Sequence, residues 1–206
     1  MPGRAPVSLS RLTGLRCGLL YYGAYDPSGI MARTAEVFGA REGRIEMAHT
    51  YGLTEGGPFV TLCPPADLFS HWGSIGRPLP GIEVALLDEA GEEVAPGRAG
   101  EICFRGPRMS GYWRKPEESA AALEGGWLHS GDVAITDEDG FLTIVDRKKD
   151  MIRTGGQNVY SKQIEDCLLL HEAVQDVAII GLPDPEFEER VCAVVVLNDP
   201  ARAGDG

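Results

Sequence analysis

The sequence predicts an α/β layer, then a β-rich subdomain, and then a small α+β domain. Three observations predict this order. An apolar run precedes a segment of helical periodicity before residue 57, short runs separated by turn formers occupy residues 74–147, and a helical segment followed by two apolar runs comes after residue 150. The 206 residues are enough to bury a core, as one large domain or two small ones.

The first stretch has the strand, helix, strand order of an α/β layer. The apolar run CGLLYYG predicts a strand. Ser28 is a possible N-cap for a helix that carries Met31, Ala35 and Phe38 on one face, and Gly39 is the expected stop. The residues before Gly57 therefore predict a helix packed against strands.

The middle stretch predicts strands joined by tight turns. The runs IEVALLD, EICFRG and FLTIVD are short and apolar or alternating, and the turn formers DEAGEE, APGRAG and TDEDG separate them. We expect a small barrel or packed sheets.

The last stretch predicts one helix and two strands. Ser161 is the expected N-cap of a helix with Ile164, Cys167, Leu168 and His171 on one face. The runs VQDVAIIGL and VCAVVVL predict strands, separated by a loop PDPEFEER. A domain boundary is expected near residue 149.

Composition excludes several classes of protein. The net charge of −12 argues against a general nucleic-acid binder, because phosphate affinity needs a surplus of Lys and Arg. An anionic ligand would need a local basic cluster, for which the alternative is a solvated run of charges. The densest candidates are Arg147, Lys148, Lys149 and Arg153.

The cysteines and apolar runs indicate a soluble protein of a reducing compartment. Five cysteines are far apart and form no CxxC pair, so we expect a cytoplasmic protein whose cysteines are mostly buried small hydrophobes. The longest strongly apolar run, residues 191–197, is far shorter than the ~20 residues of a membrane-spanning helix. The first residues lack the apolar core of a signal peptide.

The string YGLTEGGP at residues 51–58 offers groups suited to a nucleotide and a metal ion. Its glycines, Gly52 included, permit tight turns and close approach of a ligand. Thr54 offers a hydroxyl, Glu55 a hard oxygen ligand for Mg²⁺, and Tyr51 a ring that could lie against a purine. The alternative is a surface turn.

Asp132, in GGWLHSGDVA, precedes an apolar run and could accept hydrogen bonds from two ribose hydroxyls. The alternative is an Asx-type turn. Arg147 follows a strand-like run, and its planar guanidinium could hold ribose or phosphate oxygens. Its alternative is an interdomain ion pair. Gly155 and Gly156 offer a slim backbone surface past which a thin chain could run; the alternative is a loop before the helix.

Taken together, these motifs resemble those of the adenylate-forming superfamily, and most closely those of the acyl-CoA synthetases (fatty-acid CoA ligases). The resemblance runs from about residue 15 to residue 197 and rests on the order of the motifs. The matching strings are YGLTE, GSIGRPLPG, GEICFRGPRMSGYW, SGD and DRKKDMIRTGGQNVYSKQIED.

This resemblance implies an α/β fold with a β-rich subdomain, incomplete at both ends. Residues 1–148 are expected to be the C-terminal portion of the large domain, and residues 149–206 part of the mobile C-terminal domain. It also implies a two-step reaction. A carboxylic acid, such as a fatty acid, attacks the α-phosphorus of ATP to give an acyl-adenylate and pyrophosphate, and the thiol of CoA then displaces AMP.

The resemblance also implies roles for single residues. Thr54 and Glu55 are the expected catalytic residues, on the phosphate and on Mg²⁺. Tyr51 packs on adenine, and Asp132 and Arg147 hold the ribose. The other implied residues are Gly52, Gly23 and Ala24 at the nucleotide, with Tyr25 where the family's GAP has proline, Lys149 as the hinge, and Gly155 and Gly156 at the pantetheine tunnel.

Two departures from the family pattern shape the expected activity. Nothing in residues 1–50 resembles the family's phosphate loop, and its C-terminal catalytic lysine lies beyond the last residue. We therefore expect a fragment or a degenerate gene product that is inactive alone. The alternatives are a non-catalytic relic that binds AMP or an acyl-adenylate, a nonribosomal-peptide adenylation domain, whose usual RxDxQVKIRG junction differs from this one, and a luciferase-like oxidase, which has no separate support.

Overall fold

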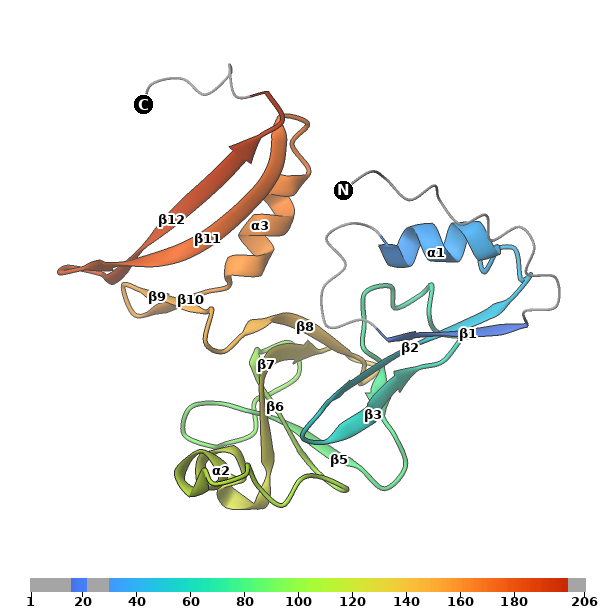
Figure 1. The fold of residues 1–206 in the computed structure, drawn as a ribbon, viewed down its shortest axis with the longest axis horizontal. Helices are drawn as coiled ribbons and strands as arrows, with labels where there is room; N and C mark the ends of the chain where they lie inside the picture. Colours follow the sequence, from blue (N-terminus) through green and yellow to red (C-terminus); the bar gives the residue numbers. More distant parts are fainter. Residues whose placement is uncertain (1–15, 22–29, 200–206) are drawn as a thin grey trace.

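The computed structural model describes residues 16–21 and 30–199, and it contains three four-stranded sheets (Figure 1). The sheets follow one another along the chain, with strand orders β1-β2-β3-β4, β5-β6-β7-β8 and β10-β9-β12-β11. This order confirms the predicted α/β layer, β-rich subdomain and small α+β unit.

The first sheet is mixed and carries one helix. Its elements are β1 (Cys17–Tyr21), α1 (Ile30–Phe38), β2 (Glu46–Leu53), β3 (Gly57–Cys63) and β4 (Arg77–Pro78). β1 and β2 pair in parallel, which requires a crossover, and α1 supplies it; the other pairs are antiparallel. Ala35 is fully buried and Phe38 packs beside it, as the helical spacing predicts. Gly39 follows the helix with φ of +67°, and Ser28 and the side chain of Met31 lie outside the described residues.

The second sheet is an antiparallel meander and holds the largest core. Its strands are β5 (Glu83–Leu87), β6 (Gly100–Arg105), β7 (Leu128–Thr136) and β8 (Leu142–Arg147). Phe104, Ile102 and Leu128 are fully buried and pack with Val60 of the first sheet, so the two sheets share one core. α2 (Pro116–Ala122) and a short 3₁₀ turn lie between β6 and β7 and were not predicted.

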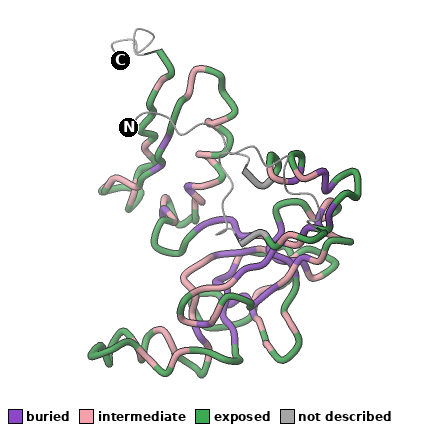
Figure 2. Tube along the Cα trace, turned by 45° about the vertical axis from the view of Figure 1, so that its right-hand side comes forward, coloured by how far each residue is buried: buried purple, intermediate pink, exposed green. Residues whose placement is uncertain are grey.

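The third sheet forms a smaller unit with its own core. Its elements are β9 (Ile152–Thr154), β10 (Gln157–Val159), α3 (Ser161–Leu169), β11 (Val174–Asp184) and β12 (Glu188–Leu197). Ile152, Val177 and Ile179 are buried beneath α3. The β11–β12 hairpin is mostly exposed, whereas the buried residues concentrate in the first two sheets (Figure 2).

Three details of this last unit correct the sequence predictions. Ser161 is not the N-cap: it is the first helical residue, and its hydroxyl donates to Asp146 instead. Ile164 and Leu168 pack on the small core, but Cys167 and His171 are exposed. The face of α3 that packs on this core includes Leu169 instead of these two residues. The strands β11 and β12 extend into the predicted loop and leave only residues 185–187 between them.

The cysteines are less buried than expected. Cys63 and Cys103 are buried, Cys192 is intermediate, and Cys17 and Cys167 are exposed. The prediction is therefore wrong for Cys17 and Cys167, which stand on a sheet-edge strand and on the solvent side of α3. Within the described ranges, no helix combines the length and apolar character needed to cross a bilayer.

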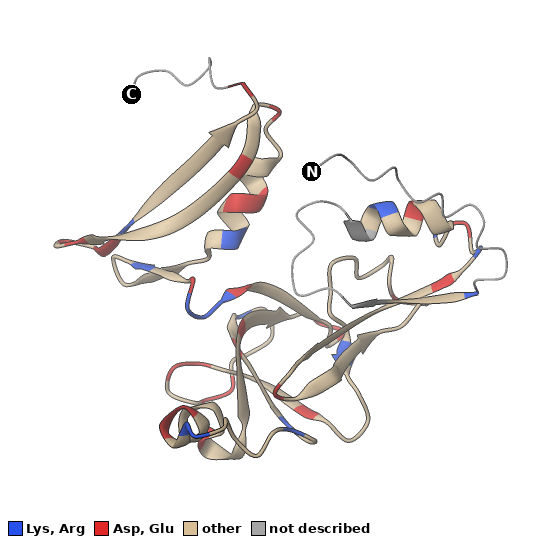
Figure 3. Ribbon diagram, in the orientation of Figure 1, with Lys and Arg blue, Asp and Glu red and all other residues tan. Residues whose placement is uncertain are grey.

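Basic residues gather where β8 leads into β9 (Figure 3). Of the four basic residues of the predicted cluster, three form ion pairs with carboxylates. Arg147 pairs with Asp132, Lys148 with Glu101, and Arg153 with Glu89. Of these pairs, Arg153–Glu89 links the third sheet to the second, whereas the other two lie within the second sheet and the turn after it.

Candidate functional site

A cavity of about 760 Å³ lies where the three sheets meet. Its walls include residues of β2, of the paired strands β7 and β8, of the turn after β8, of α3 and of β11. Five of the predicted site residues line it, namely Tyr51, Gly52, Asp132, Arg147 and Lys149. Their convergence follows from topology, since β2 packs against the sheet in which β7 and β8 are neighbours.

The carboxylate of Asp132 is the centre of this group. Asp132 and Arg147 are directly opposite in the β7–β8 register, and Arg147 Nε lies 3.2 Å from Asp132 Oδ1. The Tyr51 hydroxyl donates to Asp132 Oδ2 at 2.6 Å. The Asp132 side chain is 15% exposed and that of Arg147 57% exposed, so the pair presents a partly buried anion and an open cation to the cavity.

Tyr51 acts as a fixed hydrogen-bond donor. Burial raises the pKa of its phenol, and the negative charge of Asp132 raises it further, so the hydroxyl stays protonated. The ring is only 3% exposed and packs in the shared core with Val60. Its hydroxyl therefore orients Asp132, and packing of the ring on a purine stays a prediction.

The turn that contains Lys149 starts immediately after β8. The amides of Asp150 and Met151 both donate to the carbonyl of Arg147, at 2.9 and 3.1 Å. On the near side of the turn, buried Asp146 accepts hydrogen bonds from the Ser161 hydroxyl at 3.1 and 3.3 Å. The short turn therefore leads from β8 into β9, and the Asp146–Ser161 contact joins β8 to α3.

Thr54 and Glu55 lie in the β2–β3 turn, and neither lines the cavity with Asp132. Glu55 is held in place, because its carbonyl accepts the Met109 amide at 2.6 Å and its Oε1 accepts the Tyr112 hydroxyl at 3.0 Å. Burial and the carboxylate of Glu55 raise the pKa of Tyr112, which keeps this donor protonated. The predicted set is thus split between the cavity and this turn.

A magnesium ion fits the donors of this turn. The Glu55 carboxylate is partly exposed and the Thr54 residue is exposed, so both offer hard oxygen atoms to solvent. Mg²⁺ is usually held by one or two carboxylates together with substrate phosphates, and a single carboxylate beside a hydroxyl meets that requirement.

The predicted glycines have local structural reasons. A Cβ on Gly52 would lie 2.3 Å from the Gly57 carbonyl oxygen, so the β2–β3 pairing excludes any side chain there. Gly155 and Gly156 have φ of +56° and +75° and form the two-residue turn between β9 and β10, away from the cavity lining. Gly23 and Ala24 lie outside the described residues.

Two groups of hydrogen-bonded polar side chains were not predicted from the sequence. One is the Asp146–Ser161 contact at the cavity wall. The other is the buried carboxylate of Glu101, which accepts hydrogen bonds from Lys148 Nζ, His129 Nδ1 and the Gly131 amide at 2.8, 3.1 and 3.0 Å. The available signal was a Glu inside the otherwise apolar strand EICF.

Solved structures with this fold are adenylate-forming enzymes. The o-succinylbenzoate CoA synthetase MenE of Bacillus subtilis, in complex with the acyl-adenylate OSB-AMP, superposes with a TM-score of 0.76 at 31% identity over 90% of this chain and 37% of that one. The same enzyme in complex with ATP and magnesium gives a TM-score of 0.74. The fold is that of the adenylate-forming enzymes.

Residues 4–113 match the AMP-binding enzyme family and residues 163–205 its AMP-binding enzyme C-terminal domain. The chain belongs to the AMP-binding enzyme family. It is 51% identical over 156 residues to the long-chain-fatty-acid–CoA ligase of Salmonella typhimurium, and 44% identical over 184 residues to the medium/long-chain-fatty-acid–CoA ligase FadD8 of Mycobacterium tuberculosis. These matches cover 75% and 88% of this chain but only 28% and 32% of those relatives.

Proposed function

We propose that this chain supplies the adenosine-binding wall and the domain junction of an ATP-dependent acid–CoA ligase. The observation that carries the proposal is the Asp132 carboxylate, held between the Tyr51 hydroxyl and Arg147 on the wall of the cavity. The named CoA ligases among the relatives support a carboxylic acid, ATP and CoA as the substrates of the whole enzyme.

Asp132 would bind the ribose of the nucleotide. A carboxylate has about four acceptor positions, and Tyr51 and Arg147 occupy only one on each oxygen. Two ribose hydroxyls can therefore add to the carboxylate without displacing either neighbour. Arg147 also lines the cavity and can bind a ribose or phosphate oxygen with its other guanidinium nitrogens, and Gly52 keeps the wall beside it thin.

The phosphates would lie toward the β2–β3 turn. Thr54 offers a hydroxyl to the phosphate, and Glu55, oriented by Tyr112, would hold Mg²⁺. When bound, the ion neutralises charge that develops on the phosphate oxygens as the carboxylic acid displaces pyrophosphate. Gly23 and Ala24 are proposed to lie at the adenine and acyl side.

The third sheet would be the mobile domain of the enzyme. We place the boundary at the turn after β8, with residues 1–148 on one side and residues 149–206 on the other, and Lys149 as the hinge. The support is that the chain passes from β8 into β9 through one short turn, with the side-chain contacts Asp146–Ser161 and Arg153–Glu89 beside it. Rotation about the hinge would bring the turn at Gly155 and Gly156 toward the CoA chain in the second half-reaction.

AMP binding tests this proposal directly. Isothermal titration calorimetry on the folded chain is expected to show AMP binding that weakens by at least about 10-fold for 2′,3′-dideoxy-AMP, because the analogue lacks both hydroxyl donors to Asp132. Equal affinity for the two nucleotides would show that Asp132 does not bind the ribose. No heat with AMP would contradict the adenosine-binding role itself.

The 206 residues alone are expected to show little acid-dependent exchange of pyrophosphate into ATP. Residues 1–50 contain no glycine-, serine- and threonine-rich loop that could bind the phosphates. Radiolabelled pyrophosphate with a panel of fatty acids checks this expectation. Robust exchange by the purified chain would refute it, whereas AMP binding without exchange fits an adenosine site that needs further residues for chemistry.

A further inference from the structure

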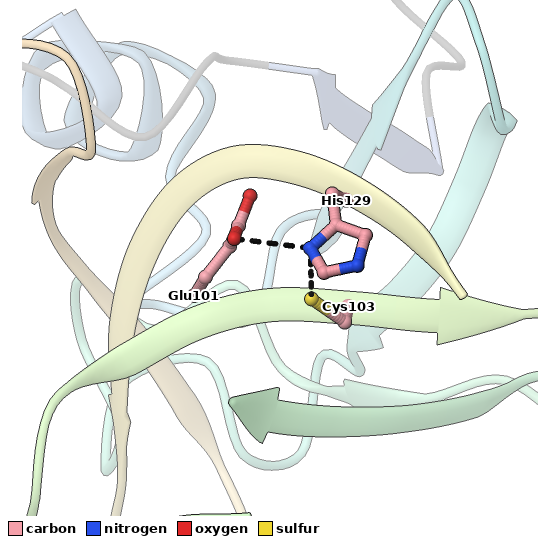
Figure 4. A group of neighbouring side chains, drawn as sticks. All are labelled: Glu101, Cys103 and His129. Carbon is pink, nitrogen blue, oxygen red and sulfur yellow. Dashed lines mark hydrogen bonds and ion pairs between the residues drawn. The ribbon is translucent and has the colours of Figure 1, made fainter. Parts of the chain in front are cut away.

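Three different metal-ligating side chains meet between β6 and β7 (Figure 4). His129 Nδ1 lies 3.1 Å from Glu101 Oε2 and 3.2 Å from Cys103 Sγ. Glu101 and Cys103 are two residues apart on β6, and Cys103 is opposite His129 in the register with β7. The pleat of two paired strands thus puts an oxygen, a sulfur and a nitrogen within 4.8 Å of one another.

This arrangement does not suit a catalytic cysteine. In a nucleophilic triad the thiol and the carboxylate contact opposite nitrogens of the imidazole, so that one holds the ring while the other exchanges a proton. Here both contact Nδ1. Cys103 is also fully buried, and burial and the charge of Glu101 raise the pKa of its thiol to about 12.

We propose that Glu101, Cys103 and His129 form a binding site for a thiophilic divalent cation of the Zn²⁺ type. The donor set fits: zinc binds thiolate, imidazole and carboxylate at about 2.0–2.3 Å, so in a tetrahedral site two of its ligand atoms lie about 3.3–3.8 Å apart. The two separations from Nδ1, 3.1 and 3.2 Å, are close to that range, and all three atoms lie within 4.8 Å of one another. The pairing of β6 and β7 places the three residues, and only small rotations of their side chains are needed to coordinate the ion.

Nδ1 is the feature that favours a cation over hydrogen bonds alone. A single Nδ1–H cannot point well at both Glu101 and Cys103, whereas a cation between the two acceptors contacts all three atoms. On binding, the Cys103 thiol loses its proton to solvent. His129 coordinates through an unprotonated Nδ1 and keeps its proton on Nε2.

The ammonium of Lys148 competes with the cation for the Glu101 carboxylate. It lies 2.8 Å from Glu101 Oε2, the same oxygen that faces His129, and the Lys148 side chain is 46% exposed. In the absence of metal it balances the charge of the buried carboxylate. A cation at the site takes over that charge, so Lys148 is released from Glu101 beside the turn at Lys149.

Cobalt binding to the folded chain tests the site. Titration with Co²⁺, which substitutes spectroscopically for Zn²⁺, is expected to give a sulfur-to-cobalt charge-transfer absorption, and added Zn²⁺ should displace it. Cys103→Ser should abolish the absorption. Glu101→Gln and His129→Gln should each weaken binding by more than about 10-fold, the least that loss of even a supporting group costs a metal site.

Matched controls separate this site from other cysteines and histidines. Cys192→Ser and Cys167→Ser should leave the absorption unchanged, as should His71→Gln, which removes a histidine beside Asp137 and Asp139. Lys148→Met should tighten binding by about 2- to 5-fold, the scale of a half-exposed ion pair, and misfolding cannot imitate that gain. No charge-transfer absorption in folded wild-type protein, or one that persists in Cys103→Ser, overturns the proposal. None of these readouts depends on nucleotide binding, so the two proposals fail separately.

Discussion

Asp132→Asn is expected to weaken AMP binding by at least about 100-fold. The amide keeps the size of the side chain but removes the charge and offers only one acceptor oxygen. Hydrogen bonds to charged groups contribute about 1.5–3 kcal/mol each, and the ribose would lose two such bonds. Arg147 would also lose its ion-pair partner at 3.2 Å, so its position over the cavity would no longer be fixed.

Calorimetry on wild-type and variant chains measures this effect. The matched control is Asp139→Asn, the same change of charge at an exposed position in the β7–β8 turn, which should leave AMP affinity within about 2-fold. A thermal melt shows whether Asp132→Asn remains folded. An Asp132→Asn chain that is folded and binds AMP within about 3-fold of wild type would rule out the ribose role.

Phe104→Ala is expected to lower the free energy of unfolding by about 3–5 kcal/mol. Phe104 is fully buried in the core that the first two sheets share. Its ring also lies against Gly56, where an added Cβ would come within 2.1 Å of it, so the ring supports the turn that carries Glu55. The loss would be a large fraction of the 5–15 kcal/mol by which most domains are stable.

Urea unfolding followed by circular dichroism measures this loss. The control is Phe59→Ala on β3 of the first sheet, where the same truncation is made at a residue that is 47% exposed. That change should cost less than about 1 kcal/mol. Equal losses for the two variants would mean that the shared core does not carry the stability of the two sheets.

The sequence pattern was sufficient for the strands that are marked by short apolar runs and for the helix that buries one face. The strands at IEVALLD, EICFRG and FLTIVD and the helix ending at Gly39 were predicted and are present. α2 escaped prediction because none of its described residues is buried, so no apolar stripe marks it. Ser161 has a residue type that caps helices, but a buried carboxylate 15 residues earlier competes successfully for its hydroxyl.

The site was predictable only in part. Tyr51, Asp132 and Arg147 carry recognisable chemistry, and the sheet topology brings them together. Spacing along the chain could not show that Tyr51 is buried with only its hydroxyl directed at Asp132, because burial depends on the packing of two sheets. Nor could it show the group around Glu101, which depends on the register of β6 against β7.

Arg147 is the last residue of β8, and Lys149 stands only two positions further along the chain. In a rotating body, a point moves in proportion to its distance from the axis. A rotation about Lys149 would therefore sweep the far end of the β11–β12 hairpin through a long arc while it barely displaces the guanidinium next to the pivot. In the enzyme proposed above, the nucleotide would then stay bound at Arg147 while the opposite wall of the site is exchanged, so the two proposed half-reactions would share one fixed anchor.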